Sequence, residues 1–517
     1  MAARVPTGFK TARTARVQDE GVRLMWPGRQ WRTAGTATTA RTARTATDGG
    51  EGRPPRSAAA THDRHDRPRI FDVTGEADGP RTQRIIHGDV LDLTGALVRE
   101  GLGGKVDLVY VDPPYASDRD YVAESRLDGP ADGRVVRTAA YEDTWSSRTG
   151  GIGAYLDMLA PRLEALSDLL GPKGTIWVHV DWRASYLVRA ILDEVLGRDA
   201  FLNEIVWRRA PNLGRQATSG QFGRTLDTLV VYGKPDATLT PPTRLEPIEE
   251  SSIRFDEQGR PFTSAPRGDY TDASIAKLEL EGRVHRTASG RVYIKYFLVK
   301  DEAGIWCRER RVDALWTDVP PLRHVAASER TGYPTQKPRA LLERIITCAT
   351  PPGGLVVDAF AGSGTTAVAA NAIGRRAVLC DRSAVAIATA RARLLRDGAD
   401  VRIERAAGAV DAAEGSAARV RIANDAHGAN GANDANGAND AKTARVTLLA
   451  PAEPMAWAVG TMKEGVFTSA WHAERALGAK AVAAAREAVV QRRHARFVRV
   501  WGDDGSVTTT AIEELST

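Results

Sequence analysis

The chain has little cysteine, and none of it is spaced to bind a metal. Only Cys307, Cys348 and Cys380 occur among 517 residues, without a CxxC pair. This pattern suits a reducing cytoplasm and predicts no zinc site. The nine histidines show no HExxH or other ligand spacing. We therefore expect no metal, and we interpret His87 and His179, which lie in strand-like runs, as core histidines with satisfied hydrogen bonds.

Long apolar segments are also absent. No run of about 18 uninterrupted apolar residues occurs, so we expect no membrane span. The first residues contain no compact apolar stretch followed by a small-residue cleavage site, so we expect a cytoplasmic protein. The 42% hydrophobic content is ordinary for a globular protein, and the length leaves room for two or three domains.

Positive charge is concentrated at the start of the chain. Residues 1–69 carry 14 Lys and Arg against 6 Asp and Glu, so the remaining 448 residues contribute −2 to the overall net charge of +6. The same segment is rich in Arg, Thr, Ala, Gly and Pro, with the near-repeats TARTAR and RTART, and we predict a disordered basic tail. The high isoelectric point is therefore no evidence that the folded part binds nucleic acid.

The middle of the chain alternates short β-branched runs with helical patterns. Strands are expected at 84–89, 106–112, 175–181, 204–209, 228–234, 355–360 and 376–381, and helices at 154–170, 183–197, 338–349, 364–374 and 383–396. Near-continuous apolar strands separated by helices predict an α/β fold with a doubly wound, mostly parallel sheet. Two consecutive strands between 204 and 234 predict an antiparallel pair at one edge.

Three segments depart from this alternation. Residues 235–330 contain many turns, charges and prolines, and an insertion of this length is typical of a functional element. Residues 408–442 repeat Gly-Ala-Asn-Asp units, which predicts a flexible linker. Residues 443–517 combine strand-like runs with an Ala-rich helical segment at 474–491, which predicts a small α+β C-terminal domain.

The tetrapeptide Asp112-Pro113-Pro114-Tyr115 ends the strand expected at 106–112. Its prolines fix the backbone, its carbonyls and carboxylate are hydrogen-bond acceptors, and its tyrosine offers a stacking face. An exocyclic amine on a base is a poor nucleophile because its lone pair is delocalised into the ring. Two acceptors can draw that nitrogen toward tetrahedral geometry for attack on a sulfonium methyl. The alternative is a proline turn after a buried strand, with Tyr115 packed at its rim.

A second motif, DAFAGSGTT at 358–366, runs from a strand through a glycine-rich turn into a helix. Gly362 and Gly364 allow close approach of the backbone to a ligand, and the helix N-terminus favours a carboxylate. A nicotinamide-binding GxGxxG would place glycine where Ala367 stands, so that alternative is only a partial match. Asp381, at the end of the next strand, is placed to bind ribose hydroxyls or, alternatively, to cap the following helix.

The two motifs are far apart in sequence, yet a doubly wound sheet can bring them together. Ligands bind at the carboxyl ends of parallel strands, where the winding direction reverses. If the strands at 106–112 and 355–360 are central neighbours, both loops face one crevice. We therefore predict a shared pocket.

With these motifs, residues 80–396 resemble the β group of DNA amino-methyltransferases, in which DPPY precedes the cofactor motif. They are similar to site-specific adenine methyltransferases and to Mod subunits of type III restriction systems. The resemblance implies a Rossmann-like, seven-stranded methyltransferase fold, S-adenosylmethionine as cofactor, and methyl transfer to a flipped base. Asp rather than Ser before PPY favours adenine N6 by analogy. The resemblance also implies a catalytic half at 80–234, a target-recognition insertion at 235–330 and a cofactor-binding half at 331–400.

The resemblance also assigns individual residues. The tetrapeptide, Asp112, Pro113, Pro114 and Tyr115, would act on the base. The cofactor would be bound by Asp89, Thr335, Lys337, Asp358, Phe360, Gly362, Gly364, Thr365 and Asp381. Lys337 and Thr335 belong to a TxKP element at 335–338, and Ala359 stands where the family usually has proline.

DNA recognition is expected within 235–330, by elimination and by the same analogy. The segment 283–300 carries basic and aromatic residues and no acid. Positive side chains bind phosphate and aromatic rings stack on bases. An ordinary strand pair with basic side chains lying along its surface fits equally well. The DNA-binding candidates are Arg283, Arg286, Arg291, Tyr293 and Lys295.

Several readings remain open from the sequence. Cytosine N4 methylation uses the same chemistry, a catalytically inactive DNA-recognition subunit of a restriction-modification system could keep the fold, and protein glutamine methylation uses a similar tetrapeptide but does not explain the insertion. No Pro-Cys dipeptide occurs, which argues against cytosine C5 chemistry. Double-stranded DNA is the expected partner, a restriction endonuclease subunit and a homodimer are left open, and no membrane contact is expected.

Overall fold

The computed structural model describes residues 69–74, 76, 78–126, 135–145, 150–213, 220–287, 289–406, 419–424, 443–450, 456–463, 466–474, 487–491, 497–501 and 507–511. The predicted basic tail lies outside these residues except for Arg69, which begins the first strand. Among the described residues, no helix is both long and apolar enough for a membrane span.

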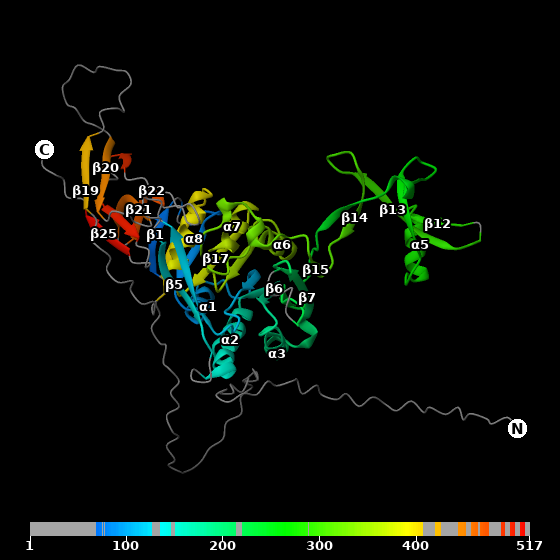
Figure 1. The fold of residues 1–517 in the computed structure, drawn as a ribbon, viewed down its shortest axis with the longest axis horizontal. Helices are drawn as coiled ribbons and strands as arrows, with labels where there is room; N and C mark the ends of the chain where they lie inside the picture. Colours follow the sequence, from blue (N-terminus) through cyan, green and yellow to red (C-terminus); the bar gives the residue numbers. More distant parts are fainter. Residues whose placement is uncertain are drawn as a thin grey trace, which may run out of the picture.

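A large mixed sheet forms the centre of the molecule (Figure 1). Its strands, in spatial order, are β15 (Leu315–Trp316), β7 (Phe201–Arg208), β8 (Leu226–Gly233), β6 (Leu170–Val180), β3 (Val106–Val111), β16 (Leu355–Asp358), β17 (Arg376–Asp381), β2 (Gln83–His87), β18 (Val401–Arg405), β1 (Arg69–Thr74), β22 (Val466–Glu474), β21 (Ala456–Lys463), β24 (Phe497–Trp501) and β25 (Val507–Ala511). From β6 to β18 every neighbouring pair is parallel. The predicted mostly parallel sheet is confirmed, although it has fourteen strands rather than seven.

The predicted antiparallel pair is also confirmed, because β8 runs antiparallel to both β6 and β7. The short strand β15 lies outside β7 and is parallel to it. At the other end, β1 is antiparallel to β18 and links the sheet to the C-terminal strands through β22. Of the seven extra strands, β24 and β25 match strand-like runs expected within 443–517, whereas β1, β15, β18, β21 and β22 were not identified from the sequence pattern.

Helices cover both faces of this sheet. They are α1 (Val90–Arg99), α2 (Gly151–Ser167), α3 (Ser185–Leu196), α6 (Arg339–Ala349), α7 (Thr365–Ala372) and α8 (Ala384–Arg396). Side chains alternate along β3, with Val109 and Val111 packing against the layer of α1 to α3 and Leu108 and Tyr110 against the layer of α6 to α8. Burial on both faces explains why these strands read as continuous apolar runs.

Two expectations about the C-terminal third are wrong in part. Glu487–Gln491, within the predicted helix at 474–491, is strand β23 and pairs with β20 (Thr443–Ala450). Its two adjacent valines favour a strand over a helix. Arg419–Asn424, within the predicted linker, is strand β19 and pairs with the other side of β20. The remainder of the linker and residues 475–486 lie outside the described residues.

Much of the predicted insertion forms a separate lobe that projects away from the sheet (Figure 1). We call residues 243–311 the insertion lobe. It contains β9 (Thr243–Pro247), β10 (Arg254–Phe255), β11 (Pro261–Pro266), α5 (Asp272–Leu280), β12 (Val284–Arg286), β13 (Val292–Lys300) and β14 (Trp306–Arg311), whose strands form one six-stranded sheet. Its small core includes Phe262, Ile275 and Ile294. β9 and β14 are paired, so the chain enters and leaves the lobe at one place.

Candidate active site

A cavity of about 900 Å³ lies at the carboxyl ends of β3 and β16. These two strands are parallel neighbours, so the loops that follow them are adjacent. The cavity is lined by residues of the tetrapeptide after β3, of the glycine motif after β16, and by Asp381 after β17. The predicted shared pocket is confirmed by this arrangement.

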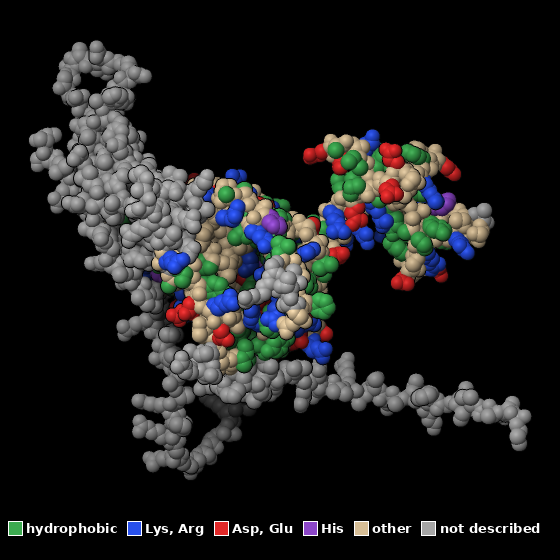
Figure 2. Space-filling view, viewed as in Figure 1, with side chains coloured by type: hydrophobic (Ala, Val, Ile, Leu, Met, Phe, Trp, Pro, Cys, Tyr) green, Lys and Arg blue, Asp and Glu red, His purple; other side chains and the backbone are tan. Residues whose placement is uncertain are grey.

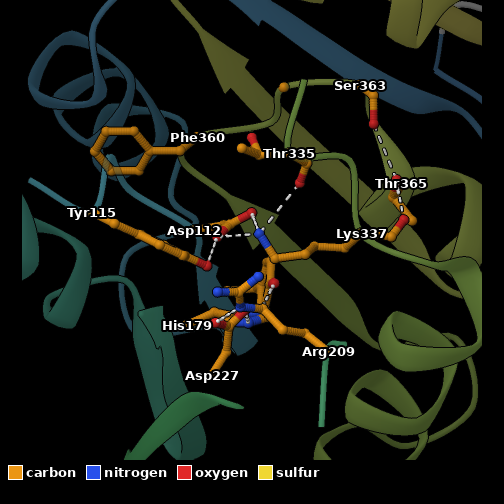
Figure 3. A network of polar contacts seen from close by, with 12 residues as sticks. Asp112, Tyr115, His179, Arg209, Asp227, Thr335, Lys337, Phe360, Ser363 and Thr365 are labelled. Carbon is orange, nitrogen blue, oxygen red and sulfur yellow. Dashed lines mark hydrogen bonds and ion pairs between the residues drawn. The ribbon is translucent and has the colours of Figure 1, made fainter. Parts of the chain in front are cut away.

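The Asp112 carboxylate is contacted on both oxygens by side chains that line the cavity (Figure 3). The Tyr115 hydroxyl donates to its Oδ1 at 2.7 Å, and the Lys337 Nζ lies 2.8 Å from Oδ1 and 2.6 Å from Oδ2. Burial, reinforced by the charge of Asp112, raises the pKa of Tyr115 well above its usual value, so the hydroxyl keeps the proton that it donates. Within the described part of the chain, the Pro113 carbonyl accepts no hydrogen bond.

The loop after the tetrapeptide is held by Asp143, a buried residue at the end of β5 (Val135–Asp143). Its carboxylate accepts hydrogen bonds from the backbone N–H groups of Tyr115, Ala116 and Ser117 at 2.9 to 3.2 Å. The Ser117 hydroxyl and the Trp145 indole N–H also donate to it. Ala116 has a φ of 55°, a strained conformation for a residue with a Cβ. Sequence reasoning missed Asp143, because no motif marks a carboxylate that acts on a loop 26 residues away.

A hairpin of β4 (Arg119–Arg126) and β5 contributes aromatic side chains to the cavity wall. Tyr121 and Tyr141 stack with ring centroids 4.7 Å apart. The Tyr141 hydroxyl lies 3.0 Å from the Thr335 Oγ1. Thr335 thus lines the cavity as predicted, with a φ of 56°, whereas neither tyrosine was predicted.

The two glycines of the second motif have different roles. Gly362 lines the cavity with a φ of 49°, and a Cβ there would lie 3.3 Å from the Tyr333 ring. Its N–H donates to the Asp381 Oδ2 at 2.8 Å. Gly364 precedes α7 and does not line the cavity. A Cβ at Gly364 would lie 2.5 Å from the Ala390 Cβ, so this glycine is required for packing of the loop against α8.

Two buried carboxylates stand at the ends of β16 and β17. Asp358 accepts hydrogen bonds from the Phe360 N–H at 3.0 Å and from the Thr366 hydroxyl at 2.5 Å. Burial raises the pKa of Asp358 to about 7, and the negative charges of Asp112 and Asp381 add to this effect. Burial also raises the pKa of Asp381. The cavity is therefore a site where negative charge is destabilised and a cation would be stabilised.

The remaining predicted cofactor residues also reach the cavity. Asp89 caps α1 by accepting from the Leu91 N–H, and its other oxygen lies 2.6 Å from the Arg162 guanidinium. Burial favours a higher pKa for Asp89, but these two donors outweigh it and lower the pKa. Thr365 and Phe360 line the cavity as well. The Lys337 ammonium, expected at the cofactor, instead contacts Asp112.

A buried polar network lies beneath the turn formed by residues 112–115, which we call the Asp112 corner (Figure 3). The Nδ1 of His179 is 2.9 Å from the Tyr110 hydroxyl and its Nε2 is 3.2 Å from Asp227. Arg209 pairs with the other oxygen of Asp227 at 2.7 Å. Burial favours a higher pKa for Asp227, but His179 and nearby cations outweigh it and lower the pKa. The interpretation of His179 as a satisfied core histidine is confirmed.

The five DNA-binding candidates all lie in the insertion lobe, away from the cavity. Arg286 pairs with Glu279 at 3.1 Å, and Arg283 lies 3.7 Å from Glu281. The Lys295 Nζ sits 5.2 Å from the Phe262 ring centroid, and Tyr293 lies beside His285. Arg291 has no ion pair with any described residue. The lobe has 13 Lys and Arg against 12 Asp and Glu, and Figure 2 shows both signs mixed over its visible face.

Comparison with known proteins supplies a family. The model of the DNA methylase family, N6_N4_Mtase, matches residues 106–392. The type II methyltransferase M.EcaI of Enterobacter cloacae is 27% identical over 314 residues, 56% of this chain and 64% of the relative. The StyLTI Mod subunit, part of a type III restriction-modification enzyme of Salmonella typhimurium, is 25% identical over 332 residues, 56% of this chain and 50% of the relative. The chain thus spans less than two thirds of either relative.

Among solved structures, the M1.HpyAVI–SAM complex aligns with a TM-score of 0.35 and 17% identity, covering 60% of this chain and 99% of that one.

Proposed function

This chain belongs to the DNA methylase family N6_N4_Mtase, and on that premise we propose that it is an S-adenosylmethionine-dependent DNA methyltransferase. Its target is the exocyclic amino group of a base flipped out of the duplex, and the base is adenine. The observation that carries the proposal is the single cavity lined by Asp112 on one side and the bend at Gly362 on the other.

The cavity fits the cofactor in both charge and shape. S-adenosylmethionine carries a sulfonium and an ammonium group, and a cation relieves the cost of burying the Asp358 and Asp381 carboxylates, whose pKa values are raised. Gly362 lines the cavity without a side chain of its own, so the bend presents backbone to a ligand there. When bound, the cofactor supplies an electrophilic methyl group on positively charged sulfur. The residues proposed to hold it are Asp89, Thr335, Asp358, Phe360, Gly362, Thr365 and Asp381.

The residues after β3 act on the base. Extruding a base costs a few kcal/mol of unstacking, which contacts in the pocket must offset. Tyr115 stacks on the ring, and the Asp112 carboxylate and Pro113 carbonyl accept the two amino hydrogens. In the structure the Tyr115 hydroxyl already donates to the Oδ1 of Asp112, so it competes with the incoming amino group for that oxygen. After transfer the nitrogen sheds one proton, and Asp112 is the acceptor placed to receive it.

Positioning supplies most of the acceleration in this mechanism. Holding two reactants in near-attack geometry is worth about 7–11 kcal/mol. Asp143 serves that purpose because it fixes the backbone of three consecutive residues from Tyr115 onward. A rigid corner presents its acceptors to the amino group without reorganisation at the moment of reaction.

The insertion lobe is proposed to contact double-stranded DNA, with the catalytic half at 80–234, the cofactor half at 331–400 and a C-terminal domain at 443–517 around it. Arg291, Tyr293 and Lys295 are the candidates with no ion pair among the described residues, whereas Arg283 and Arg286 lie beside Glu281 and Glu279. The likeness to a Mod subunit supports a restriction endonuclease subunit as partner. Co-purification from the native host, together with the mass of the isolated chain, tests that partner and a homodimer.

The proposal is tested by methyl transfer. Purified protein is incubated with tritium-labelled cofactor and either unmethylated double-stranded DNA or a protein extract, and a host expressing the gene is sequenced with base-resolved detection of methylation. We expect label in DNA, none in protein, and N6-methyladenine at one recurring sequence. N4-methylcytosine would replace the adenine assignment, and label in protein alone would overturn the function.

A further inference from the structure

Lys337 is the residue whose place in the cavity departs most from what the family resemblance implies. Its ammonium contacts both oxygens of Asp112, at 2.8 and 2.6 Å, and the Thr335 carbonyl at 3.4 Å. An ammonium group has three donors, so these contacts account for all of them. The side chains of Lys337 and Asp112 are only 10% and 18% exposed. Lys337 therefore points at the catalytic carboxylate, and no donor is left over for an anion.

The backbone of Lys337 is tied to the opposite side of the cavity. The Thr365 hydroxyl, at the start of α7, donates to the Lys337 carbonyl at 3.2 Å. Thr365 is in turn held by Arg393, a buried residue of α8 whose Nη1 lies 2.8 Å from the Thr365 Oγ1 and 2.8 Å from the Ser363 carbonyl. Pro338, the next residue, is the N-cap of α6, and its ring fixes the backbone direction there. One residue thus connects the glycine motif, through its backbone, with Asp112, through its side chain (Figure 3).

The ion pair with Lys337 leaves the Asp112 carboxylate able to accept a further hydrogen bond. A carboxylate has about four lone-pair positions, and Lys337 occupies one on each oxygen. The second position on Oδ1 is filled by the Tyr115 hydroxyl, which leaves one position on Oδ2 free. Contacts on both oxygens restrain rotation of the carboxylate about its terminal torsion. Asp112 lines the cavity, so this restraint acts on a group that the substrate amino group can reach.

We infer that Lys337 is a positioning residue for Asp112, which fixes the plane of its carboxylate relative to the glycine motif, and is not a ligand of the cofactor. The inference rests on the proposed function, because its readout is methyl transfer. It predicts that loss of the ammonium group slows the transfer step and leaves the binding of both reactants intact. A misplacement of about 1 Å at such a site can cost about 100-fold in rate.

The test compares Lys337→Met and Lys337→Arg with the wild-type protein and with Lys105→Met, a control at an exposed lysine. For each protein we measure kcat, KM for the cofactor, equilibrium binding of S-adenosylhomocysteine by calorimetry, and the melting temperature. For Lys337→Met we expect kcat to fall about 100-fold, with KM and S-adenosylhomocysteine affinity within about threefold of wild type. Lys337→Arg, which keeps a cation, should recover at least about tenfold of the lost kcat.

Two outcomes would overturn the inference. One is a Lys337→Met protein that binds S-adenosylhomocysteine more than about tenfold more weakly while keeping its kcat at saturating cofactor. That result would show that Lys337 contributes to binding of the cofactor and not to the transfer step. The other is an equal loss of kcat in the Met and Arg variants, together with a lowered melting temperature, which would indicate a structural role. If the wild-type protein itself labels no DNA, the proposed function has failed rather than the role of Lys337.

Discussion

The cavity and the insertion lobe differ in how their side chains are held. In the cavity, the acidic side chains at the strand ends are fixed by hydrogen bonds, as Asp112 is by Lys337 and Asp381 is by the Gly362 backbone. In the lobe, the basic side chains lie at the surface, and Arg286 pairs with a neighbouring acid. Catalysis requires a few groups held at fixed positions. Recognition of DNA requires a surface whose side chains make their contacts only in the complex. We therefore expect changes in the two regions to affect different steps.

Deleting the insertion lobe is expected to have the largest effect on methyl transfer while leaving cofactor binding unchanged. Residues 249–304 are replaced by a short Gly-Ser turn between the paired strands β9 and β14, whose ends are joined by the hydrogen bond from Ile248 to Trp306. Methyl transfer to DNA should fall more than about 10³-fold, because specific contacts exceed non-specific ones by at least that factor. Binding of S-adenosylhomocysteine should be unchanged. Weakened cofactor binding would show that the two regions are not independent.

A change behind the tetrapeptide should lower activity without touching any reactant. Asp143→Ala removes the acceptor for three consecutive backbone N–H groups, so the Asp112 corner loosens. We expect kcat to fall about 100-fold, with a lower melting temperature and unchanged DNA affinity. Glu164→Ala, at an exposed position of α2, is the control. Full activity in Asp143→Ala would mean that the corner is rigid without this carboxylate.

The pH dependence of the cavity follows from Asp358. Because burial raises its folded-state pKa to about 7, above the usual 3.8, its contribution to stability is fully present below about pH 4 and is lost as pH rises through about 7. Asp358→Asn should therefore become more stable relative to wild type between pH 5 and 8, as measured by melting temperature. Wild-type affinity for the S-adenosylhomocysteine ammonium should rise over the same range by up to about tenfold, and the variant should show no such rise. Parallel curves for the two proteins would contradict this assignment.

The smallest effects are expected from single residues of the lobe. Arg291 has no ion pair among the described residues, whereas Arg286 is engaged by Glu279. Arg291→Ala should weaken DNA binding a few-fold and reduce the slope of affinity against salt by about 1. Arg286→Ala should change that slope less. Both are measured by fluorescence anisotropy at several salt concentrations, and the reverse order would show that the ion pair opens on DNA.

The sequence predicted the cavity well, because its residues follow from local rules. Asp112 directly follows one apolar strand and Asp358 ends another, and in a parallel sheet such ends lie at one edge. The predicted adjacency of these two strands is confirmed. The role of Gly364 could not be read in the same way, because packing against Ala390 depends on how α8 crosses α7.

What the sequence could not predict depends on contacts between distant segments. Asp143 and Tyr141 come from a hairpin with no recognisable motif, and they reach the site only once that hairpin folds over the cavity. The direction of the Lys337 side chain is another case, since the TxKP pattern does not state which charged group it meets. The strands β19 and β23 were missed because their pairing with β20 decides their structure.

The most direct measurement compares methyl transfer and cofactor binding in one preparation of Asp112→Ala. In the proposed mechanism the amino group lies at Asp112 and the methyl donor lies against the Gly362 bend, within a single cavity. Transfer of tritiated methyl groups to DNA should therefore be lost, while S-adenosylhomocysteine and duplex DNA bind as they do to the wild-type protein. Undiminished transfer by Asp112→Ala would contradict the account.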